Sequence, residues 1–221
     1  QTWTEKAMAG ELAKPNGIIL ATGPTGSGKT TTLYAFVHEA HKPGVKIITL
    51  EDPIEYRLTG IEQTQVEATS GYDFASGLRS ILRQDPDVIL VGEIRDLETA
   101  KTAMHAALTG HLVFSTLHTN DAAGTIPRLL DLGVNPAIMA PAINVAMAQR
   151  LVRKLCIKCR QEYAAAPEER KVLEADLAAM PSQATRPQIK EPLSLWKAVG
   201  CPECNSTGYR GRVGVFEIIL V

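Results

Sequence analysis

A glycine-rich turn between an apolar run and a helical segment constrains this chain more than any other feature. Residues 23–30 read Gly-Pro-Thr-Gly-Ser-Gly-Lys-Thr and match the pattern G-x-x-x-x-G-K-[ST]. The apolar run 17–21 comes directly before this turn, and residues 30–41 have helical character. Glycines let the backbone curl so that several N–H groups converge on one anion, and a helix N-terminus adds partial positive charge there. In this context the pattern predicts a cradle for phosphate groups.

The side chains of the same turn have the chemistry that a nucleoside triphosphate requires. The Lys29 ammonium can reach β- and γ-phosphates, and the Thr30 hydroxyl can ligate Mg²⁺. A chance glycine-rich turn is the alternative, and the strand before it and the helix after it argue against that alternative. We therefore predict that ATP and Mg²⁺ bind at the following residues: Gly23, Pro24, Thr25, Gly26, Ser27, Gly28, Lys29, Thr30 and Thr31.

Short apolar runs alternate with helical patterns over residues 1–150. In the segment 73–84, Phe74, Leu78 and Ile81 fall on one face, as in a helix that packs on a core. Such alternation predicts a parallel sheet with helices on both faces, so we expect an α/β fold with a RecA-like P-loop NTPase core. The expected strands are 17–21, 45–50, 87–91 and 112–116, and the expected helices are 4–14, 30–41, 73–84 and 97–108.

All four cysteines of the chain lie in two C-x₂-C pairs, Cys156 with Cys159 and Cys201 with Cys204. Each pair brings two sulfurs round one tight turn at a spacing that suits tetrahedral Zn²⁺. The intervening residues 160–200 exceed the usual spacing of a short zinc ribbon, so redox chemistry and free thiols remain alternatives. The pattern favours a structural zinc site with four cysteine ligands.

The cysteine pairs also mark a change in the character of the chain. Proline punctuates this region, and a polar segment at 168–180 has a helical pattern. We expect a small tetracysteine zinc subdomain over 151–211. The last residues, 212–221, are expected to form a terminal strand that returns to the core.

The charge and hydropathy of the chain limit the kinds of partner that it can bind. Its 23 basic and 24 acidic side chains give a net charge of −1, without the basic excess typical of nucleic-acid binding, so no direct nucleic-acid partner is expected. No run of 18 apolar residues and no signal peptide appear, which favours the cytoplasm and reduced cysteines. The chain begins with Gln1, and we expect that one or more N-terminal domains of a longer protein are absent.

Three further segments follow the P-loop along the chain: Leu50–Tyr56, Asp87–Asp96 and Thr109–Thr119. Together with the P-loop they resemble, in order, the Walker A motif, Asp box, Walker B motif and His box of the type II/IV secretion ATPase superfamily. The paired cysteines are similar to those of its assembly branch, the secretion and type IV pilus assembly ATPases, and are lacking in the retraction ATPases.

The resemblance implies roles for individual residues. Glu55 matches the catalytic glutamate that polarises the attacking water, whereas Glu51 and Asp52 would support the metal and this loop. Glu93 stands at the acidic position of the Walker B strand, where it would hold Mg²⁺ through water. His118 would approach the γ-phosphate. For the first three acids, the start of a solvated loop is the plain alternative interpretation.

Three further residues are weaker candidates. By the resemblance, His111 would support a network between the sheet and the nucleotide, although a structural role is commoner for an isolated histidine. Arg79 and Arg83 lie one helical turn apart, away from the apolar face, and could neutralise charge on a γ-phosphate. A solvated basic face explains these arginines equally well.

The resemblance also implies an assembly and a place of action. Proteins of this kind are homo-hexameric motors that work from the cytoplasm against a platform protein of the bacterial inner membrane, with which they associate peripherally. A conjugation or DNA-uptake traffic ATPase is an alternative function. A second alternative is a nucleotide-gated interaction module with negligible hydrolysis of its own.

Overall fold

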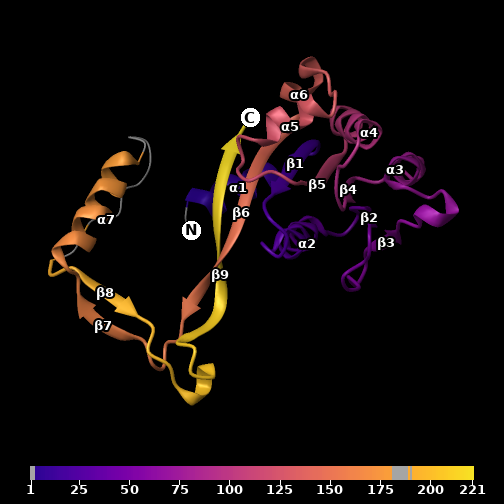
Figure 1. Ribbon diagram of the computed structural model, residues 1–221. Helices are drawn as coiled ribbons and strands as arrows, with labels where there is room; N and C mark the ends of the chain where they lie inside the picture. Colours follow the sequence, from indigo (N-terminus) through magenta and orange to yellow (C-terminus); the bar gives the residue numbers. More distant parts are fainter. Residues whose placement is uncertain (1–2, 181–188, 190) are drawn as a thin grey trace. The chain divides into compact units, whose positions relative to one another are not determined.

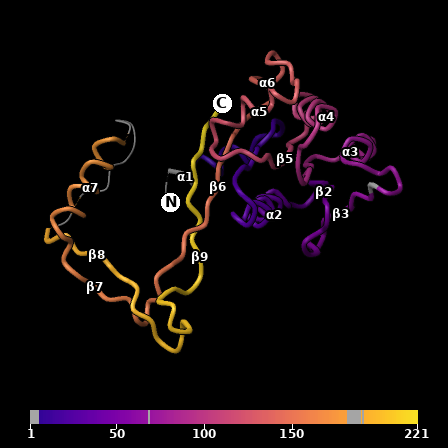
Figure 2. The backbone as a smooth tube through the Cα atoms, in the orientation of Figure 1, coloured from indigo at the N-terminus to yellow at the C-terminus, as the bar shows by residue number. Residues whose placement is uncertain are grey.

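The computed structural model describes residues 3–180, 189 and 191–221, and the chain divides into two compact units. The first unit comprises Gln1–Leu151 and Gly214–Val221, and the second comprises Val152–Val213. Figure 2 shows the path of the chain, which leaves the first unit along strand β6 and returns to it along strand β9.

Alternating strands and helices build the first unit, as Figure 1 shows. Its helices are α1 (Trp3–Leu12), α2 (Lys29–Ala40), α3 (Phe74–Leu82), α4 (Leu97–Leu108), α5 (Thr125–Asp131) and α6 (Pro136–Ala142). Its strands are β1 (Gly17–Thr22), β2 (Ile47–Glu51), β3 (Glu62–Gln65), β4 (Val88–Val91) and β5 (Leu112–Leu117). Strands β6 (Ile143–Leu155) and β9 (Tyr209–Leu220) begin or end in the second unit.

One seven-stranded sheet in the order β3-β2-β4-β5-β1-β6-β9 carries these elements. The pairs from β3 to β6 are parallel, with Gly17 of β1 opposite Leu112 of β5 and Thr22 opposite Leu117. At the β9 edge, Val221 N donates to Asn144 O, 3.0 Å away, which sets the end of β9 beside the start of β6. The predicted α/β fold with a mainly parallel sheet is confirmed.

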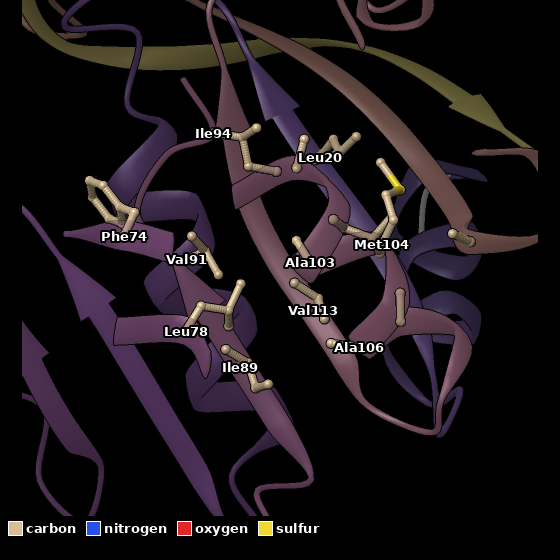
Figure 3. Packing of buried hydrophobic residues seen from close by; sticks show 14 of the residues in the cluster. Leu20, Phe74, Leu78, Ile89, Val91, Ile94, Ala103, Met104, Ala106 and Val113 are labelled. Atoms are coloured by element: carbon tan, nitrogen blue, oxygen red, sulfur yellow. The ribbon is translucent and has the colours of Figure 1, made fainter. Parts of the chain in front are cut away.

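Strands β1, β2, β4 and β5 are buried on both faces, which explains why they are mostly apolar along their length rather than alternating. Ile18 and Leu20 belong to a buried cluster with residues of α3, α4, α5 and α6. Figure 3 shows Leu20 beside Met104 and Ala103 of α4 in this cluster. Ile19 and Ala21 point the other way, into a cluster with residues of α1 and α2. The sheet is therefore the middle layer of the first unit.

Helix α3 shows how the sequence fixes this packing. Its N-cap Asp73 accepts a hydrogen bond from Ser76 N at 2.8 Å, and the Asp73 backbone N–H donates in return to the Ser76 hydroxyl oxygen at 3.0 Å, so the helix begins at Phe74. Leu78 and Ile81 are fully buried, as the period of the sequence predicts. A Cβ on Gly77 would lie 2.8 Å from the Leu50 side chain, so glycine allows α3 to approach β2 closely.

The second unit is small and open. Strands β7 (Gln161–Ala164) and β8 (Ser194–Lys197) pair antiparallel, and helix α7 (Pro167–Ala179) follows β7 with no buried residue. Arg160 stacks over the ring of Trp196, at 4.3 Å from its centroid, beside this pair of strands. No helix in the described part of the chain has the length and apolar character needed to cross a membrane.

Truncating one buried side chain tests this account of the core. Leu78→Ala should lower the free energy of unfolding by about 2–5 kcal/mol, because α3 loses apolar contact and leaves a cavity against the sheet. Leu130→Ala on α5, where the side chain is 44% exposed, should change it by only about 0.5 kcal/mol. Urea denaturation measures both, and equal losses would contradict the packing described.

Candidate functional site

The P-loop follows β1 directly and leads into α2, and its backbone requires glycine at two positions. Gly23 has φ 138° and Gly28, the N-cap of α2, has φ 90°. A Cβ on Gly23 would lie 2.4 Å from Gln149 O, and one on Gly28 would lie 2.9 Å from Gln149 Nε2. Gln149 of β6 also accepts a hydrogen bond from Thr32 Oγ1 at 2.8 Å, so β6 braces the turn from behind.

The charged and polar groups of the turn suit an anion. Lys29 Nζ donates to Gly23 O at 2.9 Å and to Pro24 O at 3.1 Å, which holds the ammonium against the loop. Burial lowers the pKa of Lys29, and the negative charge of Glu93 opposes this shift, so the two side chains are within electrostatic range. Ser27 Oγ is buried without a hydrogen-bond partner among the described residues. A phosphate group fits this combination.

The end of β5 is tied to the P-loop strand by hydrogen bonds. Thr22 Oγ1 accepts from Thr119 N at 2.8 Å and contacts Thr119 Oγ1 at 2.6 Å. Because β1 and β5 are parallel and in register, His118 comes to the same sheet edge as the P-loop. A pocket of about 240 Å³ lies there, lined by Gly23, Pro24, Thr25, His118, Thr119 and Asn120.

Glu93, just beyond the end of β4, is an acidic residue at the same edge of the sheet as the P-loop. Its carboxylate is 12% exposed and is held on both sides, by Arg95 at 2.6 Å and by His118 Nε2 at 3.3 Å. The pKa of Arg95 is raised by its hydrogen bond to Glu93 and by the negative charges of Glu93 and Asp52. Thr116 Oγ1 donates to Gly92 O at 2.7 Å, which fixes the backbone before the acid. The structure therefore brings Lys29, Glu93 and His118 together.

The two glutamates of the Asp box, Glu51 and Glu55, lie in different environments. Glu51 is 3% exposed and accepts hydrogen bonds from three protein side chains, so it supports the loop rather than a metal. Asp52 is exposed and lies in electrostatic range of Arg95. Glu55 is exposed, and its carboxylate has no hydrogen-bond or ion-pair partner in residues 3–180, 189 and 191–221. A free, exposed carboxylate can reach a water molecule.

The structure corrects the interpretation of His111. This residue precedes β5 at the amino edge of the sheet, where His111 O accepts from Gly17 N and the ring contacts Ala106 O at 3.1 Å. The length of β5 separates it from His118 and the P-loop, because parallel strands place their two ends at opposite edges. His111 therefore has a structural position, away from the predicted nucleotide network.

The two arginines of α3 lie on the surface. Arg79 pairs with Glu98 of α4 at 3.4 Å, and Arg83 Nη1 donates to Arg79 O at 3.1 Å. Both contacts link exposed groups within the first unit. A role toward the γ-phosphate of a neighbouring subunit stays a prediction for both residues.

The four cysteines of the second unit form one cluster. Their sulfur atoms all lie within 4.8 Å of one another, with separations of 4.0 Å for Cys156 and Cys201, 3.8 Å for Cys159 and Cys204, and 3.7 Å for Cys201 and Cys204. Four sulfurs at 2.3 Å from a tetrahedral zinc ion are about 3.8 Å apart. The cluster therefore has the dimensions of a tetrahedral metal site.

The electrostatics of the cluster also fit a metal. Burial tends to raise the pKa of Cys204, but N–H groups of Cys201 and Gly208, each 3.2 Å from its sulfur, and neighbouring thiols lower it to about 6. Burial and contacts with the other three thiols raise the pKa of Cys159 to about 11, against a backbone hydrogen bond from Gly200. Four thiols this close cannot all ionise unless a cation is bound among them.

Two residues of the nucleotide site carried no assignment from the sequence. Arg95 stands two residues after Glu93 in the same motif, but its ion pair becomes visible only when the loop after β4 is folded. Gln149 lies in β6, far from the P-loop along the chain, and no local pattern marks it. Proximity in the sheet, rather than spacing in the sequence, reveals both.

The strand–P-loop–helix unit and the acid at the end of a parallel strand define a P-loop nucleotide-binding domain. Residues 1–221 match the family described as "Type II/IV secretion system protein", and the chain belongs to this family. It is 52% identical over 210 residues to the type II secretion system ATPase E of Vibrio cholerae, covering 95% of this chain and 39% of that protein. Identity is also 52% over 216 residues to type II secretion system protein E of Klebsiella pneumoniae, at 98% and 41% coverage.

Solved structures of related motors have the same fold. The pilus retraction motor PilT with bound ADP is 42% identical, with a TM-score of 0.60 over 66% of this chain and 46% of that one. The ATPase DotB of Legionella pneumophila is 31% identical, with a TM-score of 0.59 over 77% and 51%. This chain spans about two fifths of the length of the curated relatives it matches.

The phosphate cradle is tested by removing its ammonium. Lys29→Ala should weaken binding of Mg-ATP by about 10- to 100-fold, because a buried charge-assisted contact to phosphate is lost. Titration calorimetry measures the dissociation constant, with Lys101→Ala on the exposed side of α4 as the control. Equal affinity of the Lys29→Ala variant and the wild type would contradict the assignment.

Proposed function

We propose that this chain is the ATP-hydrolysing motor domain of a bacterial secretion machine. The observation that carries the proposal is the convergence of the P-loop, Glu93 and His118 on one edge of the parallel sheet. A phosphate cradle, an acid for a metal ion and a polar group over the cradle are the parts that phosphoryl transfer to water requires. The relative from Vibrio cholerae is a type II secretion system ATPase, which agrees with this chemistry.

Several residues at this edge of the sheet would bind the nucleotide and its metal ion. The N–H groups of the P-loop and the Lys29 ammonium bind the β- and γ-phosphates, and the α2 N-terminus adds positive charge. The Thr30 hydroxyl and, through water, Glu93 would hold Mg²⁺, which when bound neutralises charge on the phosphates. Arg95 and His118 orient Glu93 from both sides.

Hydrolysis itself is assigned to the free acid of the Asp box. The Glu55 carboxylate accepts hydrogen bonds from the attacking water and takes up its proton. His118, which lines the pocket beside Gly23 and Thr25, donates to the γ-phosphate oxygens as negative charge builds on them. We assign Glu51 a supporting role rather than that of the base, because its carboxylate is buried and already accepts hydrogen bonds from three protein side chains.

The particular machine is proposed from the relatives. Type II protein secretion is favoured because the curated relatives named above carry that name, and assembly of a type IV pilus is the alternative within the same family. The motor would work as a homo-hexamer from the cytoplasmic side of the inner membrane. There it would push on a platform protein and associate with the membrane only through partners.

We further propose that the cysteine cluster binds one structural zinc ion. Sulfur separations of 3.7–4.0 Å for three of the pairs match a tetrahedral site. All four tetrahedral positions would be filled by Cys156, Cys159, Cys201 and Cys204, which leaves none for a substrate. The ion would join the two ends of the segment 160–200 and stabilise the second unit.

The choice between the two glutamates of the Asp box can be tested directly. Glu55→Gln should bind Mg-ATP with nearly unchanged affinity but lower kcat by about 10²-fold or more, because an amide cannot act as a base. Glu51→Gln should instead lower the Tm, since its buried carboxylate is held by three donors. Phosphate release by the whole protein measures kcat. Normal turnover of Glu55→Gln, with turnover lost in a stable Glu51→Gln, would show that the wrong glutamate was chosen.

Zinc is tested by elemental analysis and by its removal. One zinc ion per chain is expected, with an apparent binding free energy of about 10–16 kcal/mol at neutral pH. A chelator should speed amide exchange in residues 152–213 and change the dissociation constant of Mg-ATP little, because the core buries its own apolar clusters. A zinc content near zero, with four freely titratable thiols in the folded protein, would contradict the proposal.

A further inference from the structure

A buried carboxylate lies beneath the Asp-box loop. Glu51, the last residue of β2, accepts from the Tyr34 hydroxyl at Oε2, and at Oε1 from Thr49 Oγ1 at 2.6 Å and Gln63 Nε2 at 3.2 Å. A charge that is 3% exposed is stable only while its donors stay in place. The four side chains therefore form one fixed network between α2, β2 and β3.

Tyr34 links this network to the helix of the P-loop. It lies on α2, which begins at Lys29, and it is 2% exposed. Its ring packs edge-on against Tyr56, with 4.6 Å between centroids. Burial raises the pKa of Tyr34 most, and the hydrogen bond to Glu51 and the negative charge of Glu51 raise it further. The backbone N–H groups of Glu55 and Tyr56 oppose this shift. The Tyr34 side chain thus reaches the Asp-box loop through the ring of Tyr56.

Gln63 of β3 holds the other side of the same loop. Its Nε2 donates to Tyr56 O at 3.2 Å as well as to Glu51, and its Oε1 accepts from Leu58 N at 2.7 Å. The backbone around Glu55 is consequently braced from α2 and from β3, while the Glu55 carboxylate itself is free of protein partners in the described residues. A rigid backbone with a free carboxylate is the arrangement that a positioned base needs.

We propose that Tyr34 is a positioning residue for hydrolysis: through its hydrogen bond to Glu51 and its ring contact with Tyr56, it fixes the Asp-box loop to the P-loop helix. The inference rests on the proposed function of Glu55. Since Lys29 and Tyr34 lie on the same helix, the phosphates and the base share one rigid support. Misplacing a catalytic group by about 1 Å costs about 10²-fold in rate, so the hydroxyl of Tyr34 matters for turnover without touching substrate.

The test removes only that hydroxyl. In the whole protein, Tyr34→Phe should lower kcat by about 10- to 100-fold and leave the KM for Mg-ATP within about twofold, because the P-loop contacts are intact. Amide exchange at Glu55 and Tyr56 should become faster. Tyr72→Phe is the matched control: it removes the hydroxyl of a half-buried tyrosine outside the site and should change neither quantity. Gln63→Ala, which removes the brace from β3, should reproduce the loss of kcat.

Measurements on Glu55→Gln separate this inference from the proposed function. If Tyr34 acts through Glu55, Tyr34→Phe should slow the wild type but not slow Glu55→Gln further. Tyr34→Phe with wild-type kcat and wild-type exchange at Glu55 would overturn the positioning role, as would a lower kcat with unchanged exchange there. Near-normal turnover of Glu55→Gln would instead refute the assignment of Glu55, and faster exchange in Tyr34→Phe would still support the bracing of the loop.

Discussion

The parallel register of β1, β4 and β5 is the constraint on which the site depends. Gly17 lies opposite Leu112, and Val88 of β4 lies opposite the same residue, so the three strands start together and run in the same direction, with β4 ending opposite Ser115 of β5. The residues that follow these strands therefore come together at one edge of the sheet. The P-loop follows β1, Glu93 follows β4 and His118 follows β5. Hydrogen bonds from Thr119 N to Thr22 Oγ1 and from Thr116 Oγ1 to Gly92 O hold these ends in place. The chemistry of the site is a consequence of this alignment.

The Asp box needs additional support because a loop cannot rely on a strand for its position. The structure supplies it through buried Glu51, which accepts hydrogen bonds from Tyr34 of α2 and Gln63 of β3. Gln63 also donates to Tyr56 O, and the Tyr34 ring packs against the ring of Tyr56. Burying a carboxylate is costly unless it is fully hydrogen-bonded, so the network tolerates few alternative arrangements. One acid of the motif thus provides rigidity, which leaves Glu55 available for chemistry.

The sequence predicts those parts of the fold whose signals are local. The P-loop, the apolar strands β1, β2, β4 and β5, helix α3 and the cysteine pairs all follow from short patterns. Strand β3 has the polar sequence Glu-Gln-Thr-Gln and pairs at the sheet edge, so no apolar run marks it. Helix α6 leads directly into β6, and Pro141 lies inside the helix, so the change of period has no signal of its own. Strand order determines three features of the site: the packing of Gln149 against the P-loop, the ion pair of Arg95 with Glu93 and the position of His111. A single sequence does not contain that order.

The central claim is that one sheet edge binds the triphosphate between Lys29 and Glu93. The most direct measurement is a structure of the protein with Mg²⁺ and a non-hydrolysable ATP analogue. The account predicts that Lys29 Nζ leaves Gly23 O and Pro24 O, now 2.9 and 3.1 Å away, for phosphate oxygens. It also predicts a metal ion near the Thr30 hydroxyl and Glu93. A triphosphate bound elsewhere, with Lys29 still on the loop carbonyls, would contradict the account.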